Sequence, residues 1–204
     1  MTDHRQLIAI LRGVTTPDIV AICDVLVSAG ISLIEVPLNS PDPFTSIETA
    51  ASTFVGRADV GAGTVLTVED AEAVKAAGGV LVVSPDTNED VIRRTRTLGM
   101  ASYPGVFTPT DAFRAIRAGA TGLKFFPAEV LGPKGIRAMK AVLPKHLPLF
   151  AVGGASPDNF REYFDAGCAG FGLGSYIFKP GMSLSEIESR AKAAVRAYDE
   201  GLDR

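Results

Sequence analysis

Short apolar segments recur at a regular spacing along the 204-residue chain, and this periodicity constrains the fold more than any other feature. The first segment begins at residue 7 and the eighth at residue 170, so successive segments start about 23 residues apart. Such a spacing accommodates a strand, a helix and two short loops, whereas hairpins are joined by turns of a few residues. Most segments are continuous apolar runs, which indicates burial on both faces and therefore a parallel sheet. They cover residues 7–11, 33–38, 60–65, 80–84, 101–106, 122–126, 147–152 and 170–174.

Residues that start and stop helices lie between these segments. Pro17 occupies a first-turn position, and Thr67 with Asp70 resembles a capping box. Glycines such as Gly119 follow the apolar stretches, where they end helices. The helices expected from these signals cover residues 19–28, 71–77, 91–98, 112–118, 156–166 and 185–198.

Eight strand–helix units in a chain of this length predict an α/β fold, a single (β/α)8 TIM barrel in one domain over residues 1–204. A doubly wound parallel sheet is the alternative, but it usually has fewer strands for this length. In a barrel, the chemistry belongs to residues at the carboxyl ends of the strands.

Composition excludes several classes of function. The net charge is −3 and no basic stripe is visible, so nucleic acid is not an expected partner. No apolar run approaches 18 residues, so no membrane partner is expected. The start of the chain lacks a signal-peptide pattern and only Cys23 and Cys168 occur, which favours a cytoplasmic location. With these cysteines and only His4 and His146 as histidines, no metal site is predicted, although composition leaves a site of oxygen ligands open.

Two ionisable residues interrupt otherwise apolar strand segments, which is unusual unless they are paired or functional. Lys124 stands before Phe125 and Phe126, and burial there would favour the neutral amine that attacks ketones to form a Schiff base. Glu35 lies in the second segment, where apolar surroundings would suit a general base. The alternatives are a lysine that reaches solvent, or a structural ion pair between the two residues.

Glycine-rich ends of the last two strand segments indicate an anion site. Gly153 and Gly154 end the seventh segment, and Gly174 with Ser175 ends the eighth. Barrels often hold a phosphate after these two strands, where glycine lets backbone N–H groups approach the anion. Tight turns without a ligand are the alternative.

Three further polar residues follow strands. Arg12 would suit a substrate carboxylate, held bidentately, although it could equally be a surface arginine. Thr64 offers a hydroxyl at the end of the third segment, where a plain helix cap is the alternative. Asn39 precedes Ser40 and is a candidate site residue, although it is equally well explained as part of an Asx turn.

These residues fall in motifs that run in one order over most of the chain, at residues 10–12, 35–41, 61–65, 103–106, 123–129, 151–154 and 172–175. With them the sequence resembles the class I aldolases that cleave 2-keto-3-deoxy-6-phospho sugar acids. The most specific motif is Lys-Phe-Phe-Pro-Ala-Glu at residues 124–129.

The resemblance implies a mechanism and a set of site residues. It implies that Lys124 forms an imine with the C2 ketone, that Glu35 moves protons, and that no metal or other cofactor takes part. The products would be pyruvate and glyceraldehyde 3-phosphate, and the assembly a homotrimer. The implied substrate-binding residues are Arg12 and Thr64 for the carboxylate, Pro85 and Phe126 at the pyruvate end, Val152 near C4, and Gly153, Gly154, Gly174 and Ser175 for the phosphate.

Within the family the chain resembles the members specific for the galactonate substrate. Gluconate-specific relatives usually have threonine where this chain has Val152, and arginine where it has Asn39. The two substrates differ at C4, so the gluconate epimer is the alternative substrate. The lost arginine leaves Arg12 with Thr64 as the expected carboxylate site, and Phe107 has no role in this interpretation.

Two other functions compete with the aldolase. A phosphosugar isomerase or epimerase on the same barrel needs a base and a phosphate site, but no imine-forming lysine. A phosphosugar-binding module needs no ionisable pair inside the strands, and this sequence supplies one.

Overall fold

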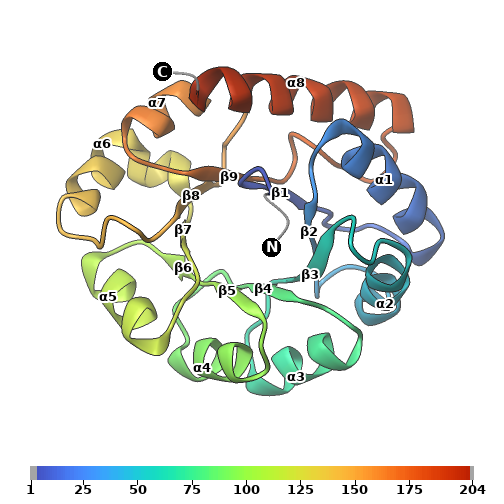
Figure 1. Ribbon diagram of the computed structural model, residues 1–204, viewed down its shortest axis with the longest axis horizontal. Helices are drawn as coiled ribbons and strands as arrows, with labels where there is room; N and C mark the ends of the chain where they lie inside the picture. Colours follow the sequence, from blue (N-terminus) through green and yellow to red (C-terminus); the bar gives the residue numbers. More distant parts are fainter. Residues whose placement is uncertain (1–3, 203–204) are drawn as a thin grey trace.

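The computed structural model describes residues 4–202 as a ring of parallel strands enclosed by a ring of helices (Figure 1). The strands are β1 (Leu7–Ile10), β2 (Leu33–Pro37), β3 (Asp59–Gly63), β4 (Leu81–Val83), β5 (Ala101–Tyr103), β6 (Gly105–Val106), β7 (Leu123–Phe125), β8 (Leu149–Val152) and β9 (Gly170–Leu173). The helices are α1 (Thr16–Ala29), α2 (Pro43–Thr53), α3 (Val68–Ala76), α4 (Glu89–Thr97), α5 (Pro109–Ala118), α6 (Ala128–Lys140), α7 (Phe160–Asp165) and α8 (Leu184–Leu202).

The strand order shows that the sheet closes on itself. It runs β5-β4-β3-β2-β1-β9-β8-β7-β6, and its two outer members are consecutive in the chain. They are two halves of one strand, separated by Pro104, which has no backbone N–H to donate to a ladder. On one side of this strand the backbone N–H of Ser84 donates to the Tyr103 carbonyl at 3.2 Å. On the other side the backbone N–H of Lys124 donates to the Pro104 carbonyl at 3.0 Å. The predicted TIM barrel is therefore confirmed, and the doubly wound sheet is wrong.

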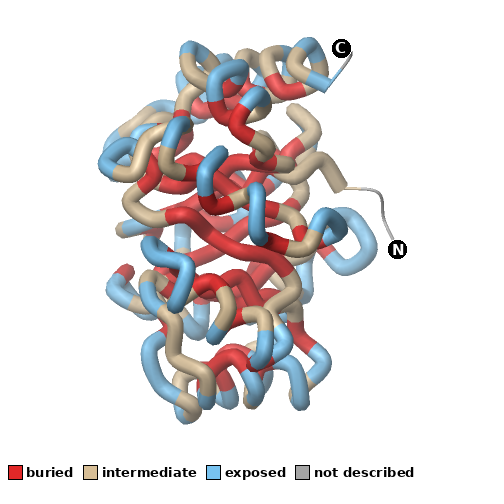
Figure 2. The backbone as a smooth tube through the Cα atoms, turned by 90° about the vertical axis from the view of Figure 1, so that its left-hand side faces the viewer, coloured by how far each residue is buried: buried red, intermediate tan, exposed pale blue. Residues whose placement is uncertain are grey.

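The sheet separates two apolar layers. Side chains on its outer face pack against the helices, and the strands are the most deeply buried part of the molecule (Figure 2). A smaller cluster fills the inside of the barrel and is formed by Ile8, Ile10, Leu33, Leu81, Val83, Tyr103, Phe150 and Val152. The strands are thus buried on both faces, as their continuous apolar runs predict.

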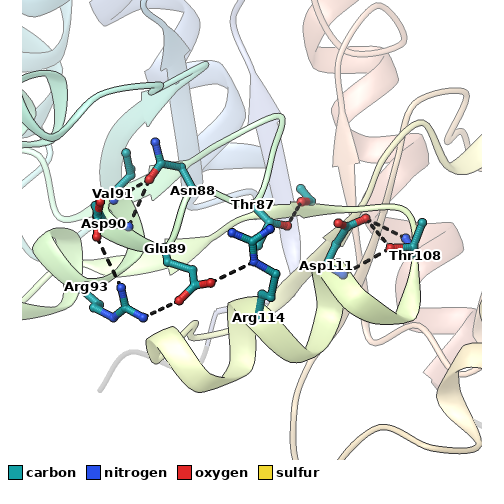
Figure 3. Close-up of polar contacts among 10 residues, drawn as sticks. Thr87, Asn88, Glu89, Asp90, Val91, Arg93, Thr108, Asp111 and Arg114 are labelled. Atoms are coloured by element: carbon teal, nitrogen blue, oxygen red, sulfur yellow. Dashed lines mark hydrogen bonds and ion pairs between the residues drawn. The ribbon is translucent and has the colours of Figure 1, made fainter.

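Side-chain caps fix the starts of α3, α4 and α5 at the carboxyl end of the barrel. The Asn88 side chain accepts from the backbone N–H of Asp90 at 3.0 Å, and Thr108 with Asp111 forms a capping box on α5 (Figure 3). Arg114 of α5 donates to Glu89 of α4 at 2.8 Å, so neighbouring helices are tied together (Figure 3). Caps of this kind hold the strand-to-helix loops, where a barrel carries its site.

The structure departs from the expected helices in several places. The sequence signals did not indicate α2, which starts after a left-handed Asp42, or α6, which is kinked at Gly132 and Pro133. The helix predicted over residues 156–166 begins only at Phe160, because the preceding residues form turns. The helix predicted to be capped by Ser185 begins at Leu184 instead, with Ser183 and Glu186 bonded to each other at its start.

The ends of the predicted domain, residues 1–3 and 203–204, lie outside the described residues, so its boundaries stay a prediction. Cys23 and Cys168 are unpaired and buried, and burial raises the pKa of each thiol to about 12. Over residues 4–202, no helix is long and apolar enough to cross a bilayer.

Candidate active site

The two ionisable residues singled out in the sequence both face the interior of the barrel, toward the carboxyl ends of its strands. Glu35 on β2 is 2% exposed and Lys124 on β7 is 7% exposed. Glu35 is in register with Ile10 of β1 and Gly61 of β3, whereas Lys124 is in register with Phe150 of β8. No ion pair joins the two side chains within the described residues, so the structural ion pair is not formed.

Burial shifts the two groups in opposite directions. It raises the pKa of Glu35 to about 7, against the attraction of the nearby Lys124 and Arg12 cations, which lowers it. Burial also lowers the pKa of Lys124, while Glu35 works against this shift and Arg12 adds to it. A carboxylate with a pKa near neutrality is suited to proton transfer, and a lysine with a lowered pKa is suited to nucleophilic attack.

Neighbouring residues hold these two groups in place. The Glu35 carboxylate lies against the Cα atom of Gly63 so closely that a Cβ atom there would overlap it. Glycine at this position of β3 is therefore a requirement for the observed place of Glu35. The Lys124 Nζ atom lies 4.6 Å from the ring centroid of Phe126, which covers one side of the amine.

Arg12, Asn39 and Thr64 form a polar cluster at the ends of the first three strands. The Arg12 guanidinium donates to the Asn39 side-chain oxygen at 2.5 Å and to the Thr64 hydroxyl at 3.4 Å. Thr64 has a φ of 56°, a left-handed conformation that is strained for a β-branched residue and is often found at functional sites. The structure thus brings Arg12 and Thr64 together as predicted and adds Asn39 to them.

A cavity of about 510 Å³ opens beside these groups, over the carboxyl ends of β8 and β9. Seven of the predicted site residues line it, namely Arg12, Phe126, Val152, Gly153, Gly154, Gly174 and Ser175. Lys124 is not part of the cavity lining, but its Nζ atom contacts the Phe126 ring, which is. Pro85 follows β4 and packs its carbonyl against Gly105, so it lies away from the cavity lining.

The backbone of the cavity wall has two features that suit an anion site. Gly153 and Gly154 have φ values of 95° and 72°, which glycine adopts without strain. The Gly174 carbonyl accepts from Ile177 at 3.0 Å and starts a tight turn at Ser175. Within the described chain the N–H groups of Gly154 and Ser175 have no hydrogen-bond partner, so both can donate to an anion.

Other residues of the cavity were not predicted from the sequence. Ser156, Tyr176 and Lys179 line it together with the predicted set. They lie in loops beyond the strand ends, where no apolar pattern draws attention to a polar residue. Among the described residues there is no group of three or more His, Cys, Asp or Glu side chains that could hold a metal ion.

Comparison with known proteins gives consistent results. The family model for KDPG and KHG aldolase matches residues 1–195. A probable 2-dehydro-3-deoxy-6-phosphogalactonate aldolase of Rhizobium meliloti is 52% identical, covering 96% of this chain and 92% of that protein. The 2-dehydro-3-deoxy-6-phosphogalactonate aldolase of Escherichia coli K12 is 44% identical and covers 96% of both chains. A solved structure described as native KDPGal superposes with a TM-score of 0.96 at 43% identity, covering 97% of this chain and 96% of that one.

Proposed function

Because the chain belongs to the KDPG and KHG aldolase family, we propose that it is a class I aldolase that cleaves 2-dehydro-3-deoxy-6-phosphogalactonate to pyruvate and D-glyceraldehyde 3-phosphate. One observation carries the chemical part of this proposal. The interior of one barrel contains both Lys124, whose pKa is lowered by burial, and Glu35, whose pKa is raised to about 7. Imine chemistry needs both a neutral amine and a proton carrier that works near neutral pH.

The reaction starts at Lys124. Its neutral amine attacks the C2 ketone, loses water through a carbinolamine and leaves a protonated imine. The imine withdraws electrons from the C3–C4 bond, which is the role a Lewis-acid metal has in other aldolases. The Phe126 ring covers one side of Nζ, and burial of the Lys124 side chain favours the uncharged amine.

Glu35 carries the protons in this scheme. Its carboxylate takes the proton of the C4 hydroxyl as the C3–C4 bond breaks and glyceraldehyde 3-phosphate leaves. The carboxylic acid then returns a proton to C3 of the enamine, and hydrolysis of the imine releases pyruvate. A pKa of about 7 lets one group serve as base and then as acid.

The rest of the site holds the two charged ends of the substrate. Arg12 with Thr64 binds the carboxylate, an assignment supported by their hydrogen bond and by the strained backbone of Thr64. Phe126 is assigned to the pyruvate carbons, supported by its contact with Lys124, and Pro85 is assigned to the same end although it lies outside the cavity lining. The four phosphate-binding residues are Gly153, Gly154, Gly174 and Ser175, supported by their place in the cavity wall.

Val152 supports the galactonate assignment. It is 5% exposed, faces the inside of the barrel and lines the cavity next to the glycine turn. A methyl group there cannot hydrogen-bond the C4 hydroxyl, so the epimer whose hydroxyl points elsewhere is preferred. The gluconate epimer remains the alternative substrate, because an apolar contact discriminates by only about 1–3 kcal/mol.

The proposal also covers the cofactor, location, partners and assembly of the protein. The covalent imine on Lys124 removes the need for a cofactor. We expect a cytoplasmic enzyme that acts on a small phosphorylated keto-deoxy sugar acid, without nucleic-acid or membrane partners. The family resemblance also supports a homotrimer, which sedimentation of the purified protein tests directly.

Borohydride trapping with pyruvate tests the function. We expect a stable adduct on Lys124 in the wild type, and neither adduct nor cleavage in Lys124→Ala, because no imine can form. Lys134→Ala, an exposed lysine on α6, is the matched control and keeps both. Cleavage near the wild-type rate in Lys124→Ala would sink the Schiff-base mechanism and favour an isomerase or epimerase. Binding of the phosphosugar acid without any turnover would favour the phosphosugar-binding module.

A further inference from the structure

Only two cationic side chains of the described residues line the cavity, Arg12 and Lys179. Arg12 is occupied by Asn39 and Thr64, at the end of the site assigned to the substrate carboxylate. Lys179 follows β9, next to the predicted phosphate residues Gly174 and Ser175. Within the described chain its ammonium group has no ion-pair or hydrogen-bond partner. A cation without a protein partner in a cavity wall is available to a ligand.

Packing fixes the position of the loop that carries Lys179. The preceding residues Ile177 and Phe178 are buried, and both donate to the Gly174 carbonyl, at 3.0 and 3.1 Å. The following Pro180 rests on Gly13, where a Cβ atom would come within 2.9 Å of its ring. Packed neighbours on both sides therefore fix the backbone of Lys179 at the rim of the cavity, while its side chain is exposed.

The anion site needs a cation for reasons of charge. The backbone N–H groups and the Ser175 hydroxyl supply hydrogen bonds to a phosphate but no net positive charge. Two carboxylates lie close by, because Glu129 packs on Gly154 and Asp158 interacts electrostatically with Tyr176 of the cavity wall. A phosphate dianion at this place is disfavoured by both carboxylates unless a positive charge offsets them.

We propose that Lys179 binds the phosphate of the substrate and selects phosphorylated over non-phosphorylated keto acids. The proposal rests on the proposed aldolase function and adds to it a specificity-determining residue outside the family motifs quoted above. Since the phosphate does not react, the contact is equally strong in the ground state and the transition state. Its loss therefore raises KM and leaves kcat nearly unchanged.

The test is steady-state kinetics of Lys179→Gln in the full chain. For the phosphorylated substrate we expect KM to rise roughly 10- to 100-fold, the range typical of a hydrogen bond to a charged group, with kcat within about threefold of wild type. Condensation of pyruvate with non-phosphorylated glyceraldehyde should proceed as in the wild type. Inorganic phosphate, as a competitive inhibitor, should bind more weakly by a similar factor, and Lys179→Arg should restore most of the affinity.

Lys145→Gln is the matched control, because Lys145 is exposed in the loop before β8, at the opposite end of that strand. An unchanged KM and phosphate inhibition in Lys179→Gln would overturn the proposal, as would an equal loss for phosphorylated and non-phosphorylated aldehydes. Failure of the aldolase assignment itself gives a different result, since the wild type would then show no cleavage and no trapped pyruvate.

Discussion

At the scale of single residues, the same physical cause gives Glu35 and Lys124 their complementary properties. Burial disfavours charge on both, so the pKa of the carboxyl group rises to about 7 and that of the ammonium group falls. Each group is thereby moved toward its neutral form. In the proposed mechanism, a single apolar environment thus prepares the nucleophile and the proton carrier for work at the same pH.

The pH dependence of the reaction follows from the Glu35 shift. The base must be ionised, so kcat/KM should rise with pH through about 7 as Glu35 loses its proton. Glu35→Gln should lose this step in the profile and slow proton exchange at the pyruvate methyl group by about 10²–10⁴, while borohydride still traps the imine. Exchange is measured by NMR in D₂O, with the exposed Glu48→Gln as control. Normal exchange in Glu35→Gln with loss of the imine would mean that Glu35 has a different role.

Val152 leads to a prediction about substrate choice. Wild type should have the higher kcat/KM for the galactonate epimer, and Val152→Thr should shift the ratio toward the gluconate epimer. The added hydroxyl can hydrogen-bond the C4 hydroxyl, a change of about 1–3 kcal/mol between the epimers. Val83→Thr is the control, because Val83 also faces the barrel interior but does not line the cavity. Equal kcat/KM values that Val152→Thr leaves unmoved would refute this role.

The residues that could be predicted from sequence are those that break a pattern. Glu35 and Lys124 stand out because charges are rare in apolar strands, and the glycine-rich ends of two strands stand out in a similar way. Asn39 was open to an Asx-turn interpretation, and its bond to Arg12 spans 27 residues of sequence. Lys179 lies in a loop after the last strand, and no sequence pattern distinguishes it from other exposed lysines.

At the scale of elements, regular packing made the strands predictable, whereas local exceptions made the predicted helices less accurate. The regularly spaced segments, most of them continuous apolar runs, located every described strand, including the fifth, although the break at Pro104 divides it in two. The α6 helix was not predicted, and it contains Gly132 and Pro133, residues that usually end helices and that here produce a kink. The first turn of α7 was placed too early, because Ser156 and Pro157 form a turn and not a helix start.

The close contact between β2 and β3 yields a prediction that tests the placement of the base. Gly63→Ala should displace the Glu35 carboxylate, because its Cβ atom would occupy the same space. We expect proton exchange to fall about as far as in Glu35→Gln, by roughly 10²–10⁴. The double variant should be no slower than either single variant, since both remove the same function. Additive losses in this cycle, with circular dichroism showing intact folds, would contradict the proposed role of Gly63.

At the scale of the whole molecule, the barrel gathers its site from residues far apart in sequence. The cluster of Arg12, Asn39 and Thr64 comes from the first three strand ends, and the cavity wall comes mainly from the last two. The eightfold repeat predicted this gathering, because parallel strands present all their carboxyl ends on one face. The repeat could not predict which side chains meet across that face, since this depends on strand register and loop packing.

The proposed chemistry makes a prediction about metal removal. The protonated imine withdraws electrons from the bond that breaks, so dialysis against EDTA should leave kcat and KM unchanged within error. Cleavage is followed by coupling pyruvate release to lactate dehydrogenase, with the chelator removed before the assay. Loss of activity that returns on adding a divalent cation would place the enzyme with the metal-dependent aldolases instead.

The pairing of β1 with β9 has a consequence for how the protein is made. Leu7 lies opposite Phe171, and Arg5 forms an ion pair with Asp199 at 2.7 Å, so the first and last described strands close the ring. A ribosome has to synthesise the chain from β1 through most of α8 before all of these partners can meet. Any strand that forms earlier during translation therefore keeps an unpaired edge, and the cavity lined by residues of β9 is completed late.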